Sequence, residues 1–426
     1  MPNSCFIGID LGTTGARAIA INDACDVVAE GKSALSDHGK DHRDPTVWMS
    51  AVRTALAQVT DALKDTSVKA ISVDGTSGSM LAIDQDGRPL AKAKMYNDAC
   101  EDPEVLAKIS EHAPATSAAH GATSGAAKVL MFQALTPSAH LIVHQADWIT
   151  GQLCGVFASD DNNALKTGYD SITQCWPDWM EEAGIDRNIL PTVQEPGSII
   201  GHVLPAVAAE YGVPPNVQFV SGTTDGCAAF LATGASQPGD GVTSIGTTLI
   251  LKILSEKPIF DPTSGIYSHR LLGNWLAGGA SNSGGGVLLK YFSPDEIAEL
   301  SSQIDPTILL NLGYYPLSQP GERFPIADPE LQPKVSPRPD NDVDFLQALF
   351  EGIASVETLG YSKLSDLGAP ALKSVRTVGG AAKNDALTEL RLSLLGVSGR
   401  PAAHVEAAYG SALLAKYGIE KSNHEA

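Results

Sequence analysis

Cysteine is scarce in this chain, with six in 426 residues, and no two of them form a C-x-x-C pair. Neither a zinc site nor a disulfide framework is therefore indicated, and a reducing, cytoplasmic compartment is expected, or the plastid stroma for a plant source. No segment reaches about 18 uninterrupted apolar residues, and no basic stretch leads into an apolar one at the N-terminus. We therefore expect no membrane span, no secretory signal and no transit peptide in these residues.

Basic residues are also few, with 29 Lys and Arg against 49 Asp and Glu, a formal charge of −20. This charge repels nucleic acid and anionic membranes, so neither is an expected partner. One small nucleotide can still bind, because backbone N–H groups and a metal act locally. The sequence also lacks a G-x-x-x-x-G-K-[ST] loop and a G-x-S-x-G elbow, and neither of its two H-x-x-x-H pairs, His38/His42 and His140/His144, has the Glu of an H-E-x-x-H motif. P-loop enzymes, serine hydrolases and metal hydrolases are therefore disfavoured.

The chain is long enough for two or three domains, and its hydrophobic content of 43% is typical of a globular protein. The first 22 residues predict a β-hairpin, residues 45–64 an amphipathic helix and residues 68–78 a buried strand. A similar series begins near residue 218, with a second hairpin at 241–254 and a long amphipathic helix after residue 341. The pattern indicates an α/β protein.

The tripeptide Gly-Thr-Thr occurs twice between apolar runs, in "FIGIDLGTTGARAIAI" (residues 6–21) and "TSIGTTLILKI" (residues 243–253). The two copies begin at Gly12 and Gly246, and 246 − 12 = 234, which is a little over half the chain. This offset favours two related domains over a short-period repeat.

A Gly-Thr-Thr-Gly turn can direct backbone N–H groups and two hydroxyls at one point and so hold phosphate oxygens. Asp10 would lie beside the first such turn, where a carboxylate is unfavourable unless a divalent cation intervenes, and Mg²⁺ fits this role. For one copy alone, an ordinary glycine hairpin turn is an equally good interpretation. Two copies favour a cleft between two domains that holds a nucleotide triphosphate from both sides.

Four segments together resemble the FGGY carbohydrate kinases, a family of the actin-like ATPase superfamily. "IGIDLGTTGARA" is similar to the first phosphate motif, "SIGTTLIL" to the second, "TVGGAAKNDALTELRLSLLG" to the adenosine motif and "EAAYGSALLA" to the closing helix. The resemblance implies two actin-like (ribonuclease H-like) α/β domains with a nucleotide cleft between them. We expect a mainly sugar-binding domain at 1–219, onto which the helix near 406–426 can pack, and a mainly ATP-binding domain at 220–426.

The resemblance also implies the nucleotide site. Asp10 would hold Mg²⁺ through water, and the two Gly-Thr-Thr turns would face the phosphates. Ala381 replaces the usual third glycine of the adenosine motif, and Gly278 is a weaker candidate. The expected ATP-binding residues are Gly12, Thr13, Thr14, Gly246, Thr247, Thr248, Gly279, Gly379, Gly380 and Asn384.

Asp225 in "FVSGTTDGCAAF" is the candidate catalytic base. A carboxylate that orients an alcohol and accepts its proton assists phosphoryl transfer. From the sequence alone, an N-cap for the following helix is the favoured interpretation. The resemblance reverses this preference, because Asp225 matches the family's catalytic aspartate, with Asp10 as the second catalytic residue.

Sugar contacts are expected mainly from the N-terminal half. Ser77 and Ser79 lie in "VDGTSGSML", although turn-forming serines explain them equally well. "MYND" (residues 95–98) resembles a W-N-D segment, but the arginine that commonly follows is absent. Asp161 or Asn162 is a further candidate, with a polar loop as the alternative. The expected substrate-binding residues are Asp10, Thr13, Ser77, Ser79, Asp98 and Asp225.

The expected reaction is transfer of the γ-phosphoryl group of Mg·ATP to a primary hydroxyl of a sugar. The chain resembles compact pentulose kinases of cyanobacteria and plastids, which favours D-ribulose, with D-xylulose second. A rival of another class is an actin-like ATPase or a sugar-responsive regulator without kinase activity. Sugar and ATP are the expected partners, and both a monomer and a homodimer remain open.

Overall fold

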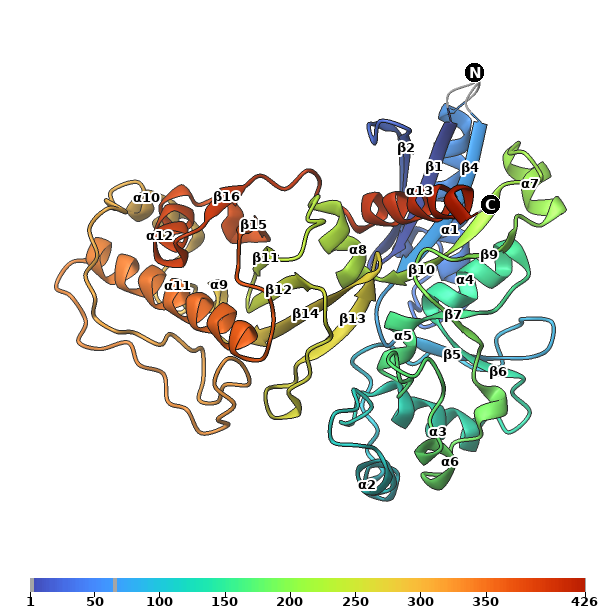
Figure 1. Cartoon of the computed structure of the whole chain (residues 1–426), viewed down its shortest axis with the longest axis horizontal. Helices are drawn as coiled ribbons and strands as arrows, with labels where there is room; N and C mark the ends of the chain where they lie inside the picture. The colour runs from blue at the N-terminus through green and yellow to red at the C-terminus, as the bar shows by residue number, and fades with distance from the viewer. Residues whose placement is uncertain (1–3, 64–66, 426) are drawn as a thin grey trace. The chain divides into compact units, whose positions relative to one another are not determined.

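The computed structural model describes residues 4–63 and 67–425 (Figure 1). The chain divides into two compact units. Unit 1 contains Met1–Ala232, His269–Gly273 and His404–Ala426, and unit 2 contains Thr233–Ser268 and Asn274–Ala403. Residues 220–232, which the sequence placed with the second domain, cluster with unit 1, because the strand that leads into them pairs within its sheet.

Unit 1 is built on a six-stranded sheet with the order β3-β2-β1-β4-β10-β9. The strands are β1 (Ser4–Leu11), β2 (Gly15–Asn22), β3 (Val27–Ala34), β4 (Ser67–Gly75), β9 (Ile199–His202) and β10 (Gln218–Thr224). The expected first hairpin is confirmed, since β1 and β2 pair antiparallel on either side of the first Gly-Thr-Thr turn. Strand β4 runs parallel to both β1 and β10, so the carboxyl ends of these three strands meet at one edge.

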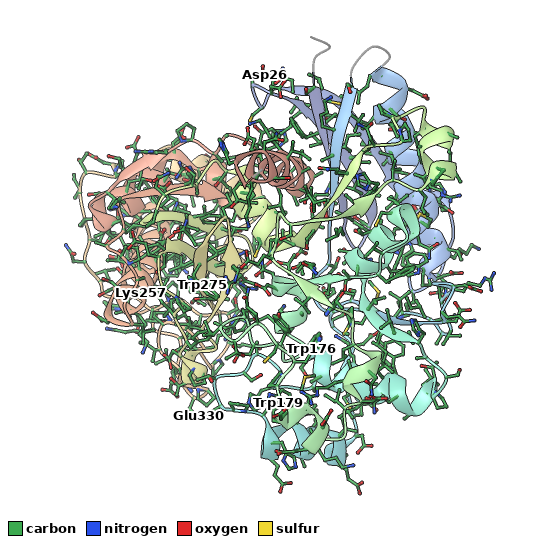
Figure 2. The ribbon with its side chains drawn as sticks, turned by 45° about the vertical axis from the view of Figure 1, so that its right-hand side comes forward. Asp26, Trp176, Trp179, Lys257, Trp275 and Glu330 are labelled. Carbon is green, nitrogen blue, oxygen red and sulfur yellow. The ribbon has the colours of Figure 1, made fainter. Side chains whose placement is uncertain are left out.

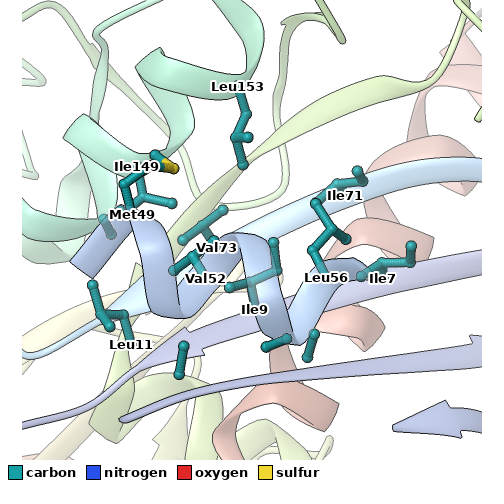
Figure 3. Packing of buried hydrophobic residues seen from close by; sticks show 14 of the residues in the cluster. Ile7, Ile9, Leu11, Met49, Val52, Leu56, Ile71, Val73, Ile149 and Leu153 are labelled. Atoms are coloured by element: carbon teal, nitrogen blue, oxygen red, sulfur yellow. The ribbon is translucent and has the colours of Figure 1, made fainter. Parts of the chain in front are cut away.

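One face of this sheet is covered by α1 (Pro45–Ala62) and α4 (Gln145–Cys154). Because side chains alternate along a strand, Ile7, Ile9 and Leu11 of β1 all point to this face. Figure 3 shows them packed with side chains of β4, α1 and α4. The predicted helix at 45–64 is confirmed over residues 45–62, with residue 64 outside the described residues, and Asp44 caps it by accepting the Thr46 N–H.

The opposite face is covered by α13 (Ala407–Glu425), the red helix beside β1, β2 and β4 in Figure 1. A glycine is needed at position 8 of β1, because a Cβ there would lie 1.9 Å from the carbonyl oxygen of Ala408. Helix α13 likewise approaches α8 (Asp225–Ala232) at Gly410. Asp10, two residues after Gly8, therefore points to the α13 side of the sheet.

A smaller hydrophobic cluster lies around the two-stranded sheet of β5 (Met80–Ile83) and β6 (Leu141–His144). Trp179 belongs to this cluster and Trp176 packs against it; Figure 2 labels both residues. The remaining elements of unit 1 are α2 (Pro103–His112), α3 (Gly125–Leu135), β7 (Ser159–Asp160), α5 (Asp161–Leu165), α6 (Trp179–Glu182), β8 (Val193–Gln194) and α7 (Pro205–Tyr211).

The second six-stranded sheet, with the order β13-β14-β12-β11-β15-β16, belongs to unit 2 except for residues 269–271 of β13, which cluster with unit 1. Its strands are β11 (Asp240–Ile245), β12 (Leu249–Ser255), β13 (Tyr267–Leu271), β14 (Asn274–Ser281), β15 (Ser374–Val378) and β16 (Ser398–Arg400). The second expected hairpin, β11 with β12, is confirmed, and β11 runs parallel to β15. An antiparallel hairpin followed by a parallel strand thus occurs in both units, which is the topology of a duplication.

The helices of unit 2 are α9 (Gly285–Leu288), α10 (Pro294–Ser301), α11 (Asp342–Asp366) and α12 (Asp385–Leu395). Helix α11 confirms the long helix predicted after residue 341 and packs its buried face on the sheet core. Across residues 4–63 and 67–425, every helix is too short or too polar to cross a bilayer.

Candidate active site

Three carboxylates come together in unit 1 at the carboxyl ends of β1, β4 and β10. Asp10 of β1 is the direct register partner of Asp74 of β4. Thr224 of β10 pairs with the residue after Asp74, and Asp225 follows it as the first residue of α8. Asp10 is 6% exposed and Asp74 is fully buried, whereas Asp225 is partly exposed. Sequence reasoning selected Asp10 and Asp225 but missed Asp74.

Burial raises the pKa of both Asp10 and Asp74. Burial is the main cause of the raised pKa of Asp10, about 6; a hydrogen bond with Asp74 and the charge of Arg17 oppose it. Burial and the charge of Asp10 raise the pKa of Asp74 well above its ordinary value. Ser411 of α13 donates a hydrogen bond to Asp74 Oδ2. The hydrogen bond between the two carboxyl groups lowers the pKa of Asp10 and raises that of Asp74, as expected when a protonated Asp74 is the donor.

The variant Asp74→Asn is expected to be more stable than the wild type at neutral and alkaline pH when Mg²⁺ is chelated. A raised folded-state pKa gives stability that is complete below the unfolded pKa and is lost as pH rises through the folded pKa. Asparagine donates to Asp10 at every pH, so the gain should be absent at pH ~4, near the unfolded pKa of Asp74, and should grow as pH rises toward its raised folded-state pKa. Urea unfolding across this pH range measures it, with the exposed Asp340→Asn as control. A difference in the free energy of unfolding between Asp74→Asn and the wild type that does not change with pH would contradict a proton shared by Asp74 and Asp10.

The first Gly-Thr-Thr turn closes the β1–β2 hairpin beside these carboxylates. The Gly12 N–H donates to the carbonyl oxygen of Gly15 at 3.0 Å, and the Thr14 carbonyl accepts from the Leu35 N–H at 2.9 Å. The side chains of Thr13 and Thr14 are exposed. Gly12 and Thr14 line a cavity of about 360 Å³ together with Arg17 and Lys32. The turn can therefore present hydroxyls and positive charge to an anion.

The second turn, at Gly246–Thr248, is backed by a glycine segment that sequence reasoning did not single out. The N–H groups of Gly285 and Gly286 donate to the carbonyls of Gly246 and Thr247 at 2.8 and 3.1 Å. A Cβ at Gly286 would lie 2.7 Å from Thr247 Cγ2, so the two segments are in direct contact. The predicted candidates Gly278 and Gly279 lie instead within β14, where the Phe324 ring covers Gly279.

A cavity of about 620 Å³ opens beside this second turn within unit 2. Four predicted residues line it: Gly246, Thr247, Gly380 and Asn384. Gly379 has a φ of 89° and packs directly on Ile245, at the end of the neighbouring strand. Apolar side chains of α9, α10, α11 and α12 form much of the remaining wall. Such a cavity suits a flat aromatic base, and the glycine turn beside it suits phosphate.

Asn384 is fixed at this cavity by both ends of its amide. Its oxygen accepts the Leu387 N–H at 2.9 Å and so caps α12, as expected for Asn at this position. Its nitrogen donates to Ser301 Oγ at 2.7 Å. The contact ties the start of α12 to the last residue of α10 across the cavity wall.

The predicted sugar residues lie on two loops of unit 1. Ser79 is fully buried and its hydroxyl accepts the Tyr96 N–H at 3.1 Å, whereas the buried Ser77 hydroxyl has no hydrogen-bond partner within the described residues. Asp98 accepts the Met95 N–H and is held by two hydrogen bonds from Arg43, which lowers its pKa. Asp98 is thus paired with an arginine that lies 55 residues earlier in the chain.

Asp161 and Asn162 are both buried, at the start of α5. Arg270 forms an ion pair with Asp161 at 2.9 Å, and burial still raises the pKa of Asp161 to about 7. The Asn162 amide donates to Thr223 Oγ1 at 2.8 Å, two residues before Asp225. These residues therefore support the strand that presents Asp225.

A divalent cation fits the carboxylates of unit 1. Burial raises the pKa of Asp10 and of Asp74, the charge of Asp225 adds to both shifts, and a cation beside Asp10 would relieve this accumulation of negative charge. Within residues 4–63 and 67–425, no three His, Cys, Asp or Glu side chains are arranged as a complete ligand set. Water and ligand oxygens would have to complete the coordination, which is the habit of Mg²⁺.

Two curated proteins similar to this chain are xylulose kinases. That of Escherichia coli K12 is 28% identical over 286 residues, which cover 63% of this chain and 59% of the relative. That of Bacillus subtilis 168 is 27% identical over 447 residues, which cover 97% of this chain and 88% of the relative. The match to the first relative thus spans about three fifths of that protein's length.

The fold is shared with a solved structure described as a xyloylose kinase from Brucella ovis. It superposes with a TM-score of 0.86 at 22% identity and covers 98% of this chain and 91% of that one. The expected two-domain actin-like α/β class is therefore confirmed. The model of the FGGY N-terminal domain matches residues 5–232, and that of the C-terminal domain matches residues 241–419. The chain thus belongs to the FGGY family of carbohydrate kinases.

Proposed function

We propose that this protein is an ATP-dependent kinase that phosphorylates a primary hydroxyl of a pentulose. The observation that carries the proposal is the convergence of Asp10, Asp74 and Asp225 beside a Gly-Thr-Thr turn at the carboxyl ends of three parallel strands. Ligands of open α/β sheets bind outside the carboxyl ends of the strands. Family membership adds independent support.

Asp225 acts as the base in this proposal. Its Oδ1 accepts the Gly226 N–H at 2.7 Å, which fixes the carboxylate at the start of α8. The sugar hydroxyl gives its proton to Asp225 as its oxygen bonds to the γ-phosphorus, and the bond from this phosphorus to the β-phosphate oxygen breaks to release ADP. Asp10 would hold Mg²⁺, and the ion would supply positive charge to neutralise the phosphates.

ATP is assigned to unit 2, with its base in the 620 Å³ cavity and its phosphates toward Gly246–Thr248. The sugar is assigned to the loops of unit 1 that carry Ser77, Ser79 and Asp98. Among pentuloses, D-xylulose takes precedence over D-ribulose, because relatives that align over 97–98% of this chain are named xylulose kinases. D-ribulose remains the second candidate.

The test is ADP release by the purified protein with Mg·ATP, alone and with D-xylulose, D-ribulose, L-ribulose or glycerol. Saturable turnover with one pentulose supports the proposal and identifies the substrate. Turnover with glycerol but with none of the pentuloses would show that the substrate is not a pentulose. Turnover that no sugar changes would contradict the kinase and favour an ATPase or regulator.

The variant Asn384→Ala is expected to raise KM for ATP about 2- to 10-fold with little change in KM for the sugar. The change removes the α12 cap and the bond to Ser301 at the cavity wall. Asn341→Ala is the matched control, because Asn341 caps α11 through the Asp344 N–H. Both variants should lose about 1 kcal/mol of stability. An equal rise of KM for ATP in both would show that the effect is only structural.

A further inference from the structure

Lys128 on α3 is a lysine whose side chain is entirely buried. Its Nζ donates to the carbonyl oxygens of Gly78 at 2.9 Å, Tyr96 at 3.1 Å and Thr123 at 2.9 Å. An ammonium group has three N–H donors, so each of them has one acceptor. Buried lysines are rare, and the contacts of this one are all main-chain carbonyls.

The three carbonyls belong to three separate loops. Gly78 lies between β4 and β5, Tyr96 precedes α2, and Thr123 precedes α3. Gly78 is flanked by Ser77 and Ser79, and Tyr96 lies two residues before Asp98. The Tyr96 N–H also donates to Ser79 Oγ at 3.1 Å. Lys128 therefore joins the two loops that carry the proposed sugar contacts.

Glycine is required at position 78, which supplies the first of these carbonyls. Gly78 has a φ of 85°, a conformation that other residues adopt with strain, and this conformation directs its carbonyl to Lys128. Lysine is likewise specific at position 128. Methionine has similar length and no donor, and the planar arginine guanidinium cannot direct three donors at carbonyls grouped around one nitrogen.

We propose that Lys128 is a positioning residue for the sugar site, whose charged ammonium group holds the loops at 76–79 and 95–98 in the arrangement that binds substrate. The proposal rests on the function proposed above. Lys128 touches neither ATP nor the reacting atoms in this scheme, so its loss should affect sugar binding before it affects chemistry.

The charge on Lys128 is only partly compensated. Burial lowers the pKa of Lys128 to about 8; Asp98 opposes this shift, and Lys94 and Lys166 add to it. Loss of the proton as pH rises through this value removes one donor and the charge. The wild-type protein should therefore lose sugar affinity in the alkaline range through this group.

The first experiment compares KM for sugar and for ATP in the wild type, Lys128→Met and Lys94→Met. We expect Lys128→Met to raise KM for the sugar about tenfold or more and to leave KM for ATP unchanged. The alkaline rise of the sugar KM should be lost in this variant. Lys94→Met removes a neighbouring charge that lies over the Phe132 ring; both of its KM values should match the wild type at neutral pH, and the alkaline rise of its sugar KM should move to higher pH. Equal rises of both KM values would overturn the proposal.

A second measurement does not depend on kinase activity. Amide hydrogen exchange at residues 76–80 and 94–100 should be faster in Lys128→Met and in Gly78→Ala than in the wild type, with Lys94→Met unchanged. Lys128→Gln keeps two N–H donors, so its exchange rates should lie between those of the wild type and Lys128→Met. It replaces the methionine variant in this experiment if that variant folds poorly. If no sugar is phosphorylated, this exchange still decides the role of Lys128. Unchanged exchange in these loops would overturn the proposal even in an active kinase.

Discussion

The variant Asp225→Asn is expected to lower kcat for the sugar about 10²- to 10⁴-fold, which is the usual contribution of a positioned general base. Asparagine keeps the acceptor for the Gly226 N–H, so the start of α8 should be preserved. It cannot take the hydroxyl proton, so the loss should appear in kcat and equally in kcat/KM. Steady-state ADP release with the best sugar measures it.

Asp342→Asn is the matched control for this prediction, because Asp342 is likewise the first residue of a helix and lies on the surface of unit 2. It should leave kcat unchanged. Thermal unfolding of both variants should stay near the wild type, which separates a chemical defect from a folding defect. An Asp225→Asn protein that keeps more than about a tenth of the wild-type kcat would rule out the base.

The variant Arg391→Met is expected to lower the free energy of unfolding of unit 2 by about 3–5 kcal/mol, the usual cost of breaking a buried ion pair. Arg391 and Glu357 are both fully buried, and the Arg391 Nη2 lies 2.6 Å from Glu357 Oε1. The Thr243 hydroxyl also donates to Glu357, and Arg391 Nη1 donates to Thr377 Oγ1. Methionine would leave the Glu357 carboxylate buried without its cation.

The double variant Arg391→Met, Glu357→Gln should recover part of this loss, because no uncompensated charge remains. Arg88→Met is the control, since Arg88 is 75% exposed and pairs with Asp86 on the surface, so about 0–1 kcal/mol is expected. Amide exchange by mass spectrometry shows whether the change is confined to residues 233–268 and 274–403. A loss below about 1 kcal/mol would contradict a stabilising role for the pair.

The elements that follow from short-range patterns were predictable from the sequence. The hairpin around Gly12 alternates apolar residues on both sides of a glycine turn, and the helices at 45–62 and 342–366 carry apolar residues at helical spacing. The turns were recognised because the Gly-Thr-Thr tripeptide occurs twice between apolar runs, and glycine permits a tight turn there. The structure places those patterns in the expected elements.

The site residues that were missed depend on pairings between distant segments. Asp74 ends a buried strand just as Asp10 does, which was a usable indication, but its partner is decided by the parallel register of β1 and β4. Arg43 and Asp98 meet across 55 residues, and nothing near either residue indicates the other. Lys128 would ordinarily be placed on the surface, because lysine is rarely buried. Gly284–Gly286 act through close contacts that only the folded backbone reveals.

Helix α13 links the active-site carboxylates to the order in which the chain is synthesised. Its Ser411 bonds to Asp74, and its backbone packs on Gly8, yet residues 233–403 are translated between the first 232 residues and this helix. A nascent chain that has just completed β10 therefore exposes the apolar face formed by Phe6, Ile19 and Val220. Asp74 lacks the hydrogen bond from Ser411 until translation reaches that residue. We therefore expect ribosome-bound chains that stop before α13 to bind chaperones.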